Sequence, residues 1–146
     1  MTQSVTPNAK ELIERFEDGT AGVGVIGMGY VGLPLAMLMV KAGYRTLGFD
    51  VDCEKVDRLN RGESYIHHFP VERIQEARKD GKFQATTDYA RLKEVEAIII
   101  CVPTPLNEYR EPDLSYVEAT GQSVGEHLRR GQIVILESTT YPGTTE

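Results

Sequence analysis

The sequence VGVIGMGYVGLP, residues 23–34, decides the fold of this chain. Its first four residues, Val23–Ile26, form a short apolar run that is typical of a buried β-strand. The run leads directly into three glycines with the spacing GxGxxG, and the nearly continuous apolar stretch Leu33–Ala42 then predicts a buried helix. A strand that enters a helix through such a turn is the context in which GxGxxG indicates dinucleotide binding.

Each glycine of this turn has its own part in that interpretation. Gly27 permits a tight turn, Gly29 lets the backbone approach a pyrophosphate, and Gly32 lets the helix pack closely against the strand. The free amides at the start of the helix carry about half a positive charge, which suits a phosphate. We therefore expect these three glycines, with Tyr30 and Val31 between them, to bind the cofactor. A glycine turn of an α/β domain that binds nothing is the alternative.

An acidic residue follows the next predicted strand. Tyr44–Phe49 is expected to form a second strand that ends at Asp50, 18 residues after Gly32. A carboxylate at this place accepts hydrogen bonds from the adenosine ribose and repels a 2′-phosphate, so NAD is favoured over NADP. Two alternatives stay open. Asp50 could merely cap the strand end, or the pair of features could belong to a methyltransferase, although the spacing suits a dinucleotide.

Strands and helices alternate along the rest of the chain. The pattern predicts helices over Asn8–Asp18, Asp52–Asn60, Val71–Lys79, Asp88 to about Glu94 and Asp113 to about Arg129, and strands over Phe83–Thr86, Ala97–Val102 and Ile133–Leu136. This alternation is typical of an α/β fold, a Rossmann-type doubly wound parallel sheet between two layers of helices. The expected strand order is 3-2-1-4-5, with a ligand at the carboxyl ends of the first and fourth strands.

Composition narrows the classes of function. The chain has 146 residues and a formal net charge of −6, which argues against a general surface for nucleic acid or for anionic membranes. It has no apolar run near the roughly 18 residues of a membrane span, and its start lacks the features of a secretory signal. One domain with a cytoplasmic location is expected.

The cysteines and histidines predict neither a disulfide scaffold nor a metal site. Cys53 and Cys101 form no CxxC pair, and the adjacent His67 and His68 lack the spacing of zinc ligands. We expect Cys101 to be a buried small hydrophobe, and Cys53 to start a helix without a catalytic role. Tyr65 and the two histidines are interpreted as a surface loop, with the alternative that this loop edges the cofactor cleft.

Four motifs, taken in order, resemble the NAD-binding half of the UDP-sugar 6-dehydrogenases, the relatives of UDP-glucose dehydrogenase. They are GMGYVGLP at 27–34, Asp50 with Lys55, VPTP at 102–105, and STTYPG at 138–143. The stretch EPDLSYV at 111–117 resembles the branch that oxidises UDP-N-acetylglucosamine or UDP-N-acetylmannosamine. The resemblance covers about residues 20 to 146.

The resemblance implies an activity and a set of roles. The family oxidises the C6 alcohol of the sugar to a carboxylate with two NAD and no metal, as a homodimer, and carries its nucleophilic cysteine in a later domain. Lys55 matches a basic residue that reaches the adenosine ribose, and Thr104 matches a threonine beside the cofactor. Thr139 matches a threonine that lies near the nicotinamide and assists the chemistry through water. The alternatives are a solvated helix lysine for Lys55, a capping hydroxyl between two prolines for Thr104 and a loop hydroxyl for Thr139.

The resemblance also implies a domain division. Residues 1–20 are expected to form an N-terminal helical arm and residues 21–146 the NAD-binding domain, with the catalytic and sugar-binding domains downstream. Such a chain should bind NAD and catalyse nothing. Two other functions stay open, a stand-alone dinucleotide-sensing regulatory module and a domain of another two-domain dehydrogenase, such as a β-hydroxyacid type. A coding sequence that continues past Glu146 into a glycine-flanked cysteine would favour the dehydrogenase.

Overall fold

The computed structural model describes residues 9–139 and contains five strands, five α-helices and one short 3₁₀ helix. Their bounds in chain order are α1 Ala9–Glu17, β1 Gly22–Ile26, α2 Gly32–Lys41, β2 Arg45–Phe49, α3 Cys53–Asn60, α4 Val71–Lys79, β3 Phe83–Thr86, η1 Tyr89–Glu94, β4 Ala97–Ile100, α5 Ser115–His127 and β5 Ile133–Leu136. Within this part of the chain, every helix is too short or too polar to cross a lipid bilayer.

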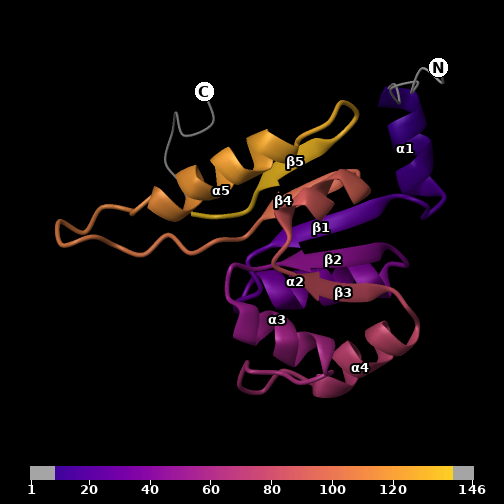
Figure 1. The fold of residues 1–146 in the computed structure, drawn as a ribbon, viewed down its shortest axis with the longest axis horizontal. Helices are drawn as coiled ribbons and strands as arrows, with labels where there is room; N and C mark the ends of the chain where they lie inside the picture. Colours follow the sequence, from indigo (N-terminus) through magenta and orange to yellow (C-terminus); the bar gives the residue numbers. More distant parts are fainter. Residues whose placement is uncertain (1–8, 140–146) are drawn as a thin grey trace.

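The strands form a single parallel sheet in the order β3-β2-β1-β4-β5, which confirms the predicted order (Figure 1). β1 lies at the centre, with Val23 paired with Thr46 of β2 on one side and with Ala97 of β4 on the other. All four strand pairs are parallel. The carboxyl ends of the strands therefore meet at one edge, where the chain leaves β1 for the glycine turn.

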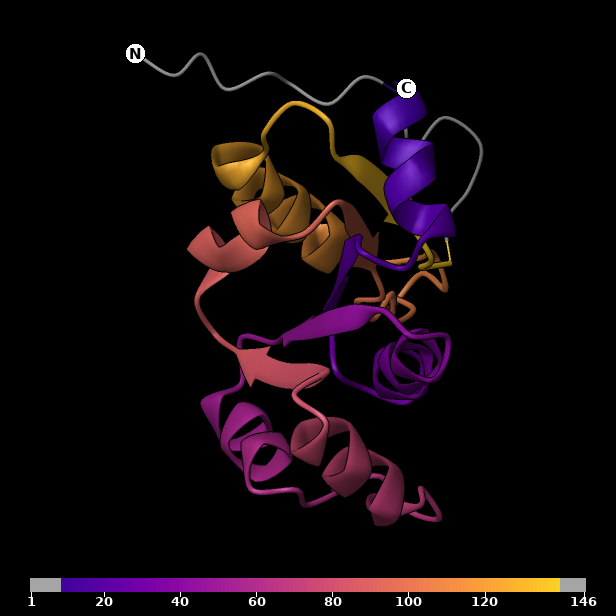
Figure 2. The same ribbon diagram turned by 90° about the vertical axis from the view of Figure 1, so that its right-hand side faces the viewer.

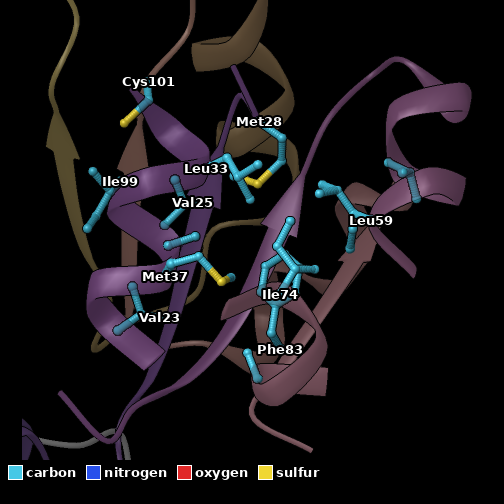
Figure 3. Close-up of a cluster of buried hydrophobic side chains, with 14 residues drawn as sticks. Val23, Val25, Met28, Leu33, Met37, Leu59, Ile74, Phe83, Ile99 and Cys101 are labelled. Carbon is cyan, nitrogen blue, oxygen red and sulfur yellow. The ribbon is translucent and has the colours of Figure 1, made fainter. Parts of the chain in front are cut away.

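The sheet separates two apolar clusters, as expected when side chains alternate between the faces of a strand. On one face Val23 and Val25 of β1 pack with α2, α3 and α4 through residues such as Leu33, Leu59 and Ile74 (Figure 3). On the other face Ile26 and Ile98 pack with η1 and α5. Figure 2 shows η1 and α5 side by side on that face. The predicted three-layer arrangement is confirmed.

Two predictions about the elements are wrong, each for a local reason. β4 ends at Ile100 instead of Val102, because its neighbours β1 and β5 end at the matching positions Ile26 and Leu136. The predicted helix from Asp88 to about Glu94 is confirmed as the 3₁₀ helix η1, which the Asp88 carboxylate caps by accepting from Ala90 N–H.

The second difference concerns the start of α5. Asp113 does not cap this helix, which begins at Ser115 and ends at His127. The Asp113 carboxylate accepts a hydrogen bond from Ser115 N–H at 2.9 Å, in a turn that precedes the helix. The N-cap position of the helix is Leu114. Asp113 N–H in turn donates to the Pro105 carbonyl, so the residue closes the proline-rich loop.

A buried carboxylate holds the amino ends of the strands together. Glu96, 3% exposed, precedes β4 and accepts hydrogen bonds from Arg15 of α1, from Arg129 after α5 and from the backbone N–H of Gly22. The Arg129 guanidinium also donates to the Val95 carbonyl. This cluster fixes α1 against the end of the sheet that lies opposite the glycine turn.

We expect Glu96→Gln to lower the free energy of unfolding by at least about 2 kcal/mol, because the charge-assisted bonds from two guanidinium groups and one backbone N–H are weakened together. The matched control is Glu94→Gln, which removes an exposed carboxylate paired with Arg45 and Arg91 and should cost at most about 1 kcal/mol. Urea denaturation measures both, and equal losses would contradict the role given to Glu96.

Candidate functional site

A cleft of about 980 Å³ lies along the carboxyl ends of the strands. Its walls come from the glycine turn after β1, the segment after β2, the loop after β4, one face of α5 and the segment after β5. Eight of the nine residues predicted to bind cofactor line this one cleft: Gly27, Gly29, Tyr30, Val31, Asp50, Lys55, Thr104 and Thr139. The ninth, Gly32, lies behind the turn.

The three glycines meet three different steric demands. A Cβ atom on Gly32 would lie 1.6 Å from the Gly27 carbonyl oxygen, so α2 can begin this close to β1 only with glycine at this position. Gly27 has φ +94°, and a Cβ there would lie 2.6 Å from the Cys101 carbonyl oxygen. A Cβ on Gly29 would meet no atom within 4 Å. Gly32 and Gly27 are therefore required for close packing, whereas Gly29 leaves open space in the cleft.

Asp50 connects the end of β2 to the glycine turn. Its carboxylate is 8% exposed and accepts from Met28 N–H at 2.8 Å through Oδ2 and from Asp52 N–H at 2.9 Å through Oδ1. Each carboxylate oxygen can accept a further bond, since an ionised carboxylate offers about four lone pairs. Asp50 therefore anchors the turn and still presents acceptors to the cleft.

The start of α2 faces the cleft without a side-chain cap. Val31 occupies the N-cap position and makes no side-chain capping bond, and the Tyr30 and Val31 side chains are 78% and 61% exposed. Leu33 N–H and Leu35 N–H already donate to backbone carbonyls and Pro34 has no N–H, so the positive end of the helix dipole lies at the amides that precede Leu33. Lys55 is the one Lys or Arg among the described residues lining the cleft, so these amides carry much of its positive potential.

The opposite wall contains the two predicted threonines. Thr104 follows β4 in the loop that extends away from the body of the domain in Figure 1, and Thr139 follows β5. Ser138, beside Thr139, donates its hydroxyl to the Val102 carbonyl at 2.8 Å and so joins the segments after β4 and β5. Residues 140–143 of the motif at 138–143 lie outside the described residues.

The two cysteines lie in different surroundings. Burial, with the Glu137 carboxylate adding to it, raises the pKa of the Cys101 thiol to about 11, so the thiol stays protonated at neutral pH. Cys101 directly follows β4 and is buried, as expected, although the strand ends one residue earlier. Cys53 is exposed and begins α3 behind the Asp52 N-cap. Among residues 9–139, no group of three or more His, Cys, Asp or Glu could hold a metal ion.

The structure adds residues that the sequence did not single out. Thr87 and Tyr89 continue the wall beside Asp50, and α5 contributes Ser123 and His127. Burial, followed by the Asp50 carboxylate, raises the pKa of the Tyr89 phenol to about 12. Thr87 directly follows β3, and its place at the carboxyl edge of the sheet was the one signal that could have indicated it.

The loop of residues 63–70 is not a simple surface loop. His67 and His68 are exposed, as that interpretation expected, but Tyr65 is half-buried and donates its hydroxyl to the Met28 carbonyl inside the glycine turn. Tyr65 does not line the cleft itself. The sequence could not indicate this contact, because Tyr65 and Met28 are 37 positions apart and the bond leaves no pattern in the neighbouring residues.

Comparison with known proteins gives a consistent result. The family described as UDP-glucose/GDP-mannose dehydrogenase family, NAD binding domain, matches residues 21–146. The chain is 40% identical over 125 residues to a UDP-N-acetyl-D-mannosamine dehydrogenase of Pyrococcus horikoshii, covering 85% of this chain and 30% of that protein. It is also 40% identical over 124 residues to a UDP-N-acetyl-D-glucosamine 6-dehydrogenase of Salmonella typhi, covering 85% and 28%.

The solved structures agree with the sequence comparison. A UDP-D-ManNAc dehydrogenase from Pyrococcus horikoshii superposes with a TM-score of 0.80 at 40% identity, over 84% of this chain and 29% of that one. The chain thus spans about 30% of the length of the curated relatives it matches.

The contrast between Gly29 and Gly32 gives a test of the turn. We expect Gly32→Ala to fail to fold or to lose about 3 kcal/mol or more of unfolding free energy, because the new methyl group overlaps the Gly27 carbonyl. Gly29→Ala should change stability by less than about 1 kcal/mol, since its methyl group enters open space. Thermal and urea unfolding followed by circular dichroism measure both; similar losses would contradict this geometry.

Proposed function

Because this chain belongs to the UDP-glucose/GDP-mannose dehydrogenase family as its NAD-binding domain, we propose that the described cleft holds NAD. In the whole protein we propose that this cofactor serves the oxidation of the C6 alcohol of a UDP-N-acetylhexosamine to the uronate. One observation carries the proposal: Gly29 leaves open space beside the uncapped start of α2, next to the Asp50 carboxylate.

The residues of the cleft fit a dinucleotide. We infer that the amides following Met28 hold the pyrophosphate, because a Cβ at Gly29 would fill the space that lets the backbone approach. The volume of about 980 Å³ lies at the upper end of the range of roughly 300–1,000 Å³ for ligand pockets. Bound NAD would supply the hydride acceptor, and the chain's own part is to bind and orient it.

Asp50 and Lys55 are proposed to recognise the adenosine ribose. Asp50 lines the cleft and its oxygens have acceptor capacity to spare, and Lys55 lines the same cleft from the first turn of α3. Asp52, which lies between these two residues in the sequence, also lines the cleft. A 2′-phosphate would therefore meet two carboxylates and one ammonium group, which supports a preference for NAD over NADP.

The two threonines are proposed to act at the other end of the cleft. Thr104, on the loop after β4, would contact the cofactor, and Thr139 would lie near the nicotinamide and assist the chemistry by holding a water molecule. Their support is that both hydroxyl-bearing residues line the cleft that contains the glycine turn. The hydrogen bond from Ser138 to the Val102 carbonyl supports a fixed position for the segment that carries Thr139.

The N-acetylhexosamine branch is supported from two directions. The relatives named above act on UDP-N-acetyl-D-mannosamine or UDP-N-acetyl-D-glucosamine by their names. The stretch at 111–117 that resembles this branch lies just before and within α5, which lines the cleft. Membership of this family favours the dehydrogenase over the methyltransferase and the stand-alone regulatory module. The division at residue 20, the homodimer and the cytoplasmic location stay predictions.

The preference for NAD should depend on the charge of Asp50. We expect this chain to bind NAD at least about 30-fold more tightly than NADP, because the added phosphate approaches two carboxylates. Asp50→Asn should reduce that ratio to about threefold or less, since one of the two negative charges is gone. Calorimetric titration with both nucleotides measures the ratio.

A matched variant controls for net charge. Asp57→Asn removes an exposed carboxylate of α3 that does not line the cleft, and its ratio should stay that of the unmodified chain. Equal or tighter binding of NADP by the unmodified chain would contradict the assignment of Asp50.

The activity itself is tested on the whole protein that contains this chain. With NAD and UDP-N-acetylglucosamine or UDP-N-acetylmannosamine, it should form two NADH per sugar, whereas the 146-residue chain alone should form none above background. Absorbance at the NADH band and mass analysis of the product measure both. Turnover by the isolated chain that is lost in Cys53→Ser would show that the active site is misplaced.

A further inference from the structure

Tyr65 makes a contact that the proposed function does not yet use. It lies in the loop between α3 and α4, and its hydroxyl donates to the carbonyl of Met28, the residue between the first two glycines of the turn. The side chain is half-buried against the apolar cluster beneath α2. A loop that is distant in sequence therefore holds the turn, although Tyr65 itself does not line the cleft.

The peptide groups on both sides of Met28 are held. Met28 N–H donates to Asp50 Oδ2 at 2.8 Å, and Met28 C=O accepts from Tyr65. The Met28 side chain is fully buried and points into the core with Leu33 (Figure 3). One residue later, the Gly29 carbonyl already accepts from Leu33 N–H at 3.1 Å. The path of the backbone from Met28 into α2 is thus set by three independent anchors, of which Tyr65 is one.

The Tyr65 ring has a second set of contacts. Lys55 Nζ and Arg58 Cζ each lie 5.7 Å from the ring centroid, within the range of cation–π interactions. Arg58 also donates to the Ser64 carbonyl at 2.9 Å, which ties α3 to the loop that carries Tyr65. Lys55 is the cation that lines the cleft, so the ring helps to determine where this ammonium group lies.

The phenol is suited to a donor role. Burial, followed by the Asp50 and Asp52 carboxylates, raises the pKa of Tyr65 well above its ordinary value. The hydroxyl therefore stays protonated at neutral pH, where it can donate to the carbonyl.

We propose that Tyr65 is a positioning residue for dinucleotide binding: its hydroxyl orients the Met28 carbonyl, and its ring holds Lys55 at the edge of the cleft. This inference rests on the proposed function, because it takes the cleft to be an NAD site. Holding the turn in its binding conformation before the ligand arrives reduces the ordering that binding requires, and so tightens binding without a contact of its own.

The test uses Tyr65→Phe, which removes the hydroxyl and keeps the ring. We expect binding of NAD and of ADP-ribose, which share the pyrophosphate, to weaken about fivefold, whereas adenosine binding stays within about twofold. The matched control is Tyr44→Phe, which also deletes a phenol hydroxyl that donates to a backbone carbonyl, that of Phe16 at 2.7 Å. It should leave all three affinities unchanged, although both variants lower the thermal midpoint.

A second variant tests the ring. Tyr65→Leu should bind NAD more weakly than Tyr65→Phe, and in a Lys55→Met background the difference between the two should disappear, since the ring then has no cleft cation to hold. Unchanged NAD affinity in Tyr65→Phe, with only a lower midpoint, would reduce Tyr65 to a structural role and overturn the inference. So would an equal loss for adenosine. If the unmodified chain bound no NAD, that result would contradict the proposed function itself, and the inference about Tyr65 with it.

Discussion

The close approach of Gly32 to the Gly27 carbonyl determines how the rest of the domain is arranged. Since a Cβ at Gly32 would lie 1.6 Å from that oxygen, α2 begins in direct contact with the end of the central strand. This contact places the start of the helix, with the positive end of its dipole, at the carboxyl edge of the sheet, and it lets Leu33 and Met37 enter the core below. The site and the core are therefore consequences of the same steric constraint.

The two ends of the sheet carry their polar groups for different purposes. At the amino ends, the buried Glu96 carboxylate has its acceptors occupied by Arg15, Arg129 and the Gly22 amide, so it stabilises the fold. At the carboxyl ends, Asp50 also binds two backbone amides, but it lies in the wall of a cleft. Both carboxylates are buried, and only their surroundings distinguish a structural role from a binding role.

Sequence reasoning succeeded where the determinants are local. The glycine turn, Asp50 and the strands at 83–86 and 133–136 follow from patterns a few residues long, and the strand order follows from the rules of parallel sheets. It failed where a partner is distant. Glu96 pairs with Arg15 across 81 positions, and Tyr65 reaches Met28 across 37, so neither role leaves a trace in the neighbouring residues. Asp113 was assigned wrongly for a local reason, because an aspartate two residues before a helix resembles an N-cap in the sequence.

The central claim is that NAD binds at the carboxyl edge of the sheet, over the start of α2. Titration of the ¹⁵N-labelled chain with NAD, followed by amide chemical shifts, tests it most directly. The account predicts saturable shifts concentrated at Gly29, Tyr30 and Val31, at Asp50 and at Thr104, with the amides around Glu96 unchanged. Saturable shifts confined to the surface between α2 and α4, or an absence of shifts at millimolar NAD, would contradict it.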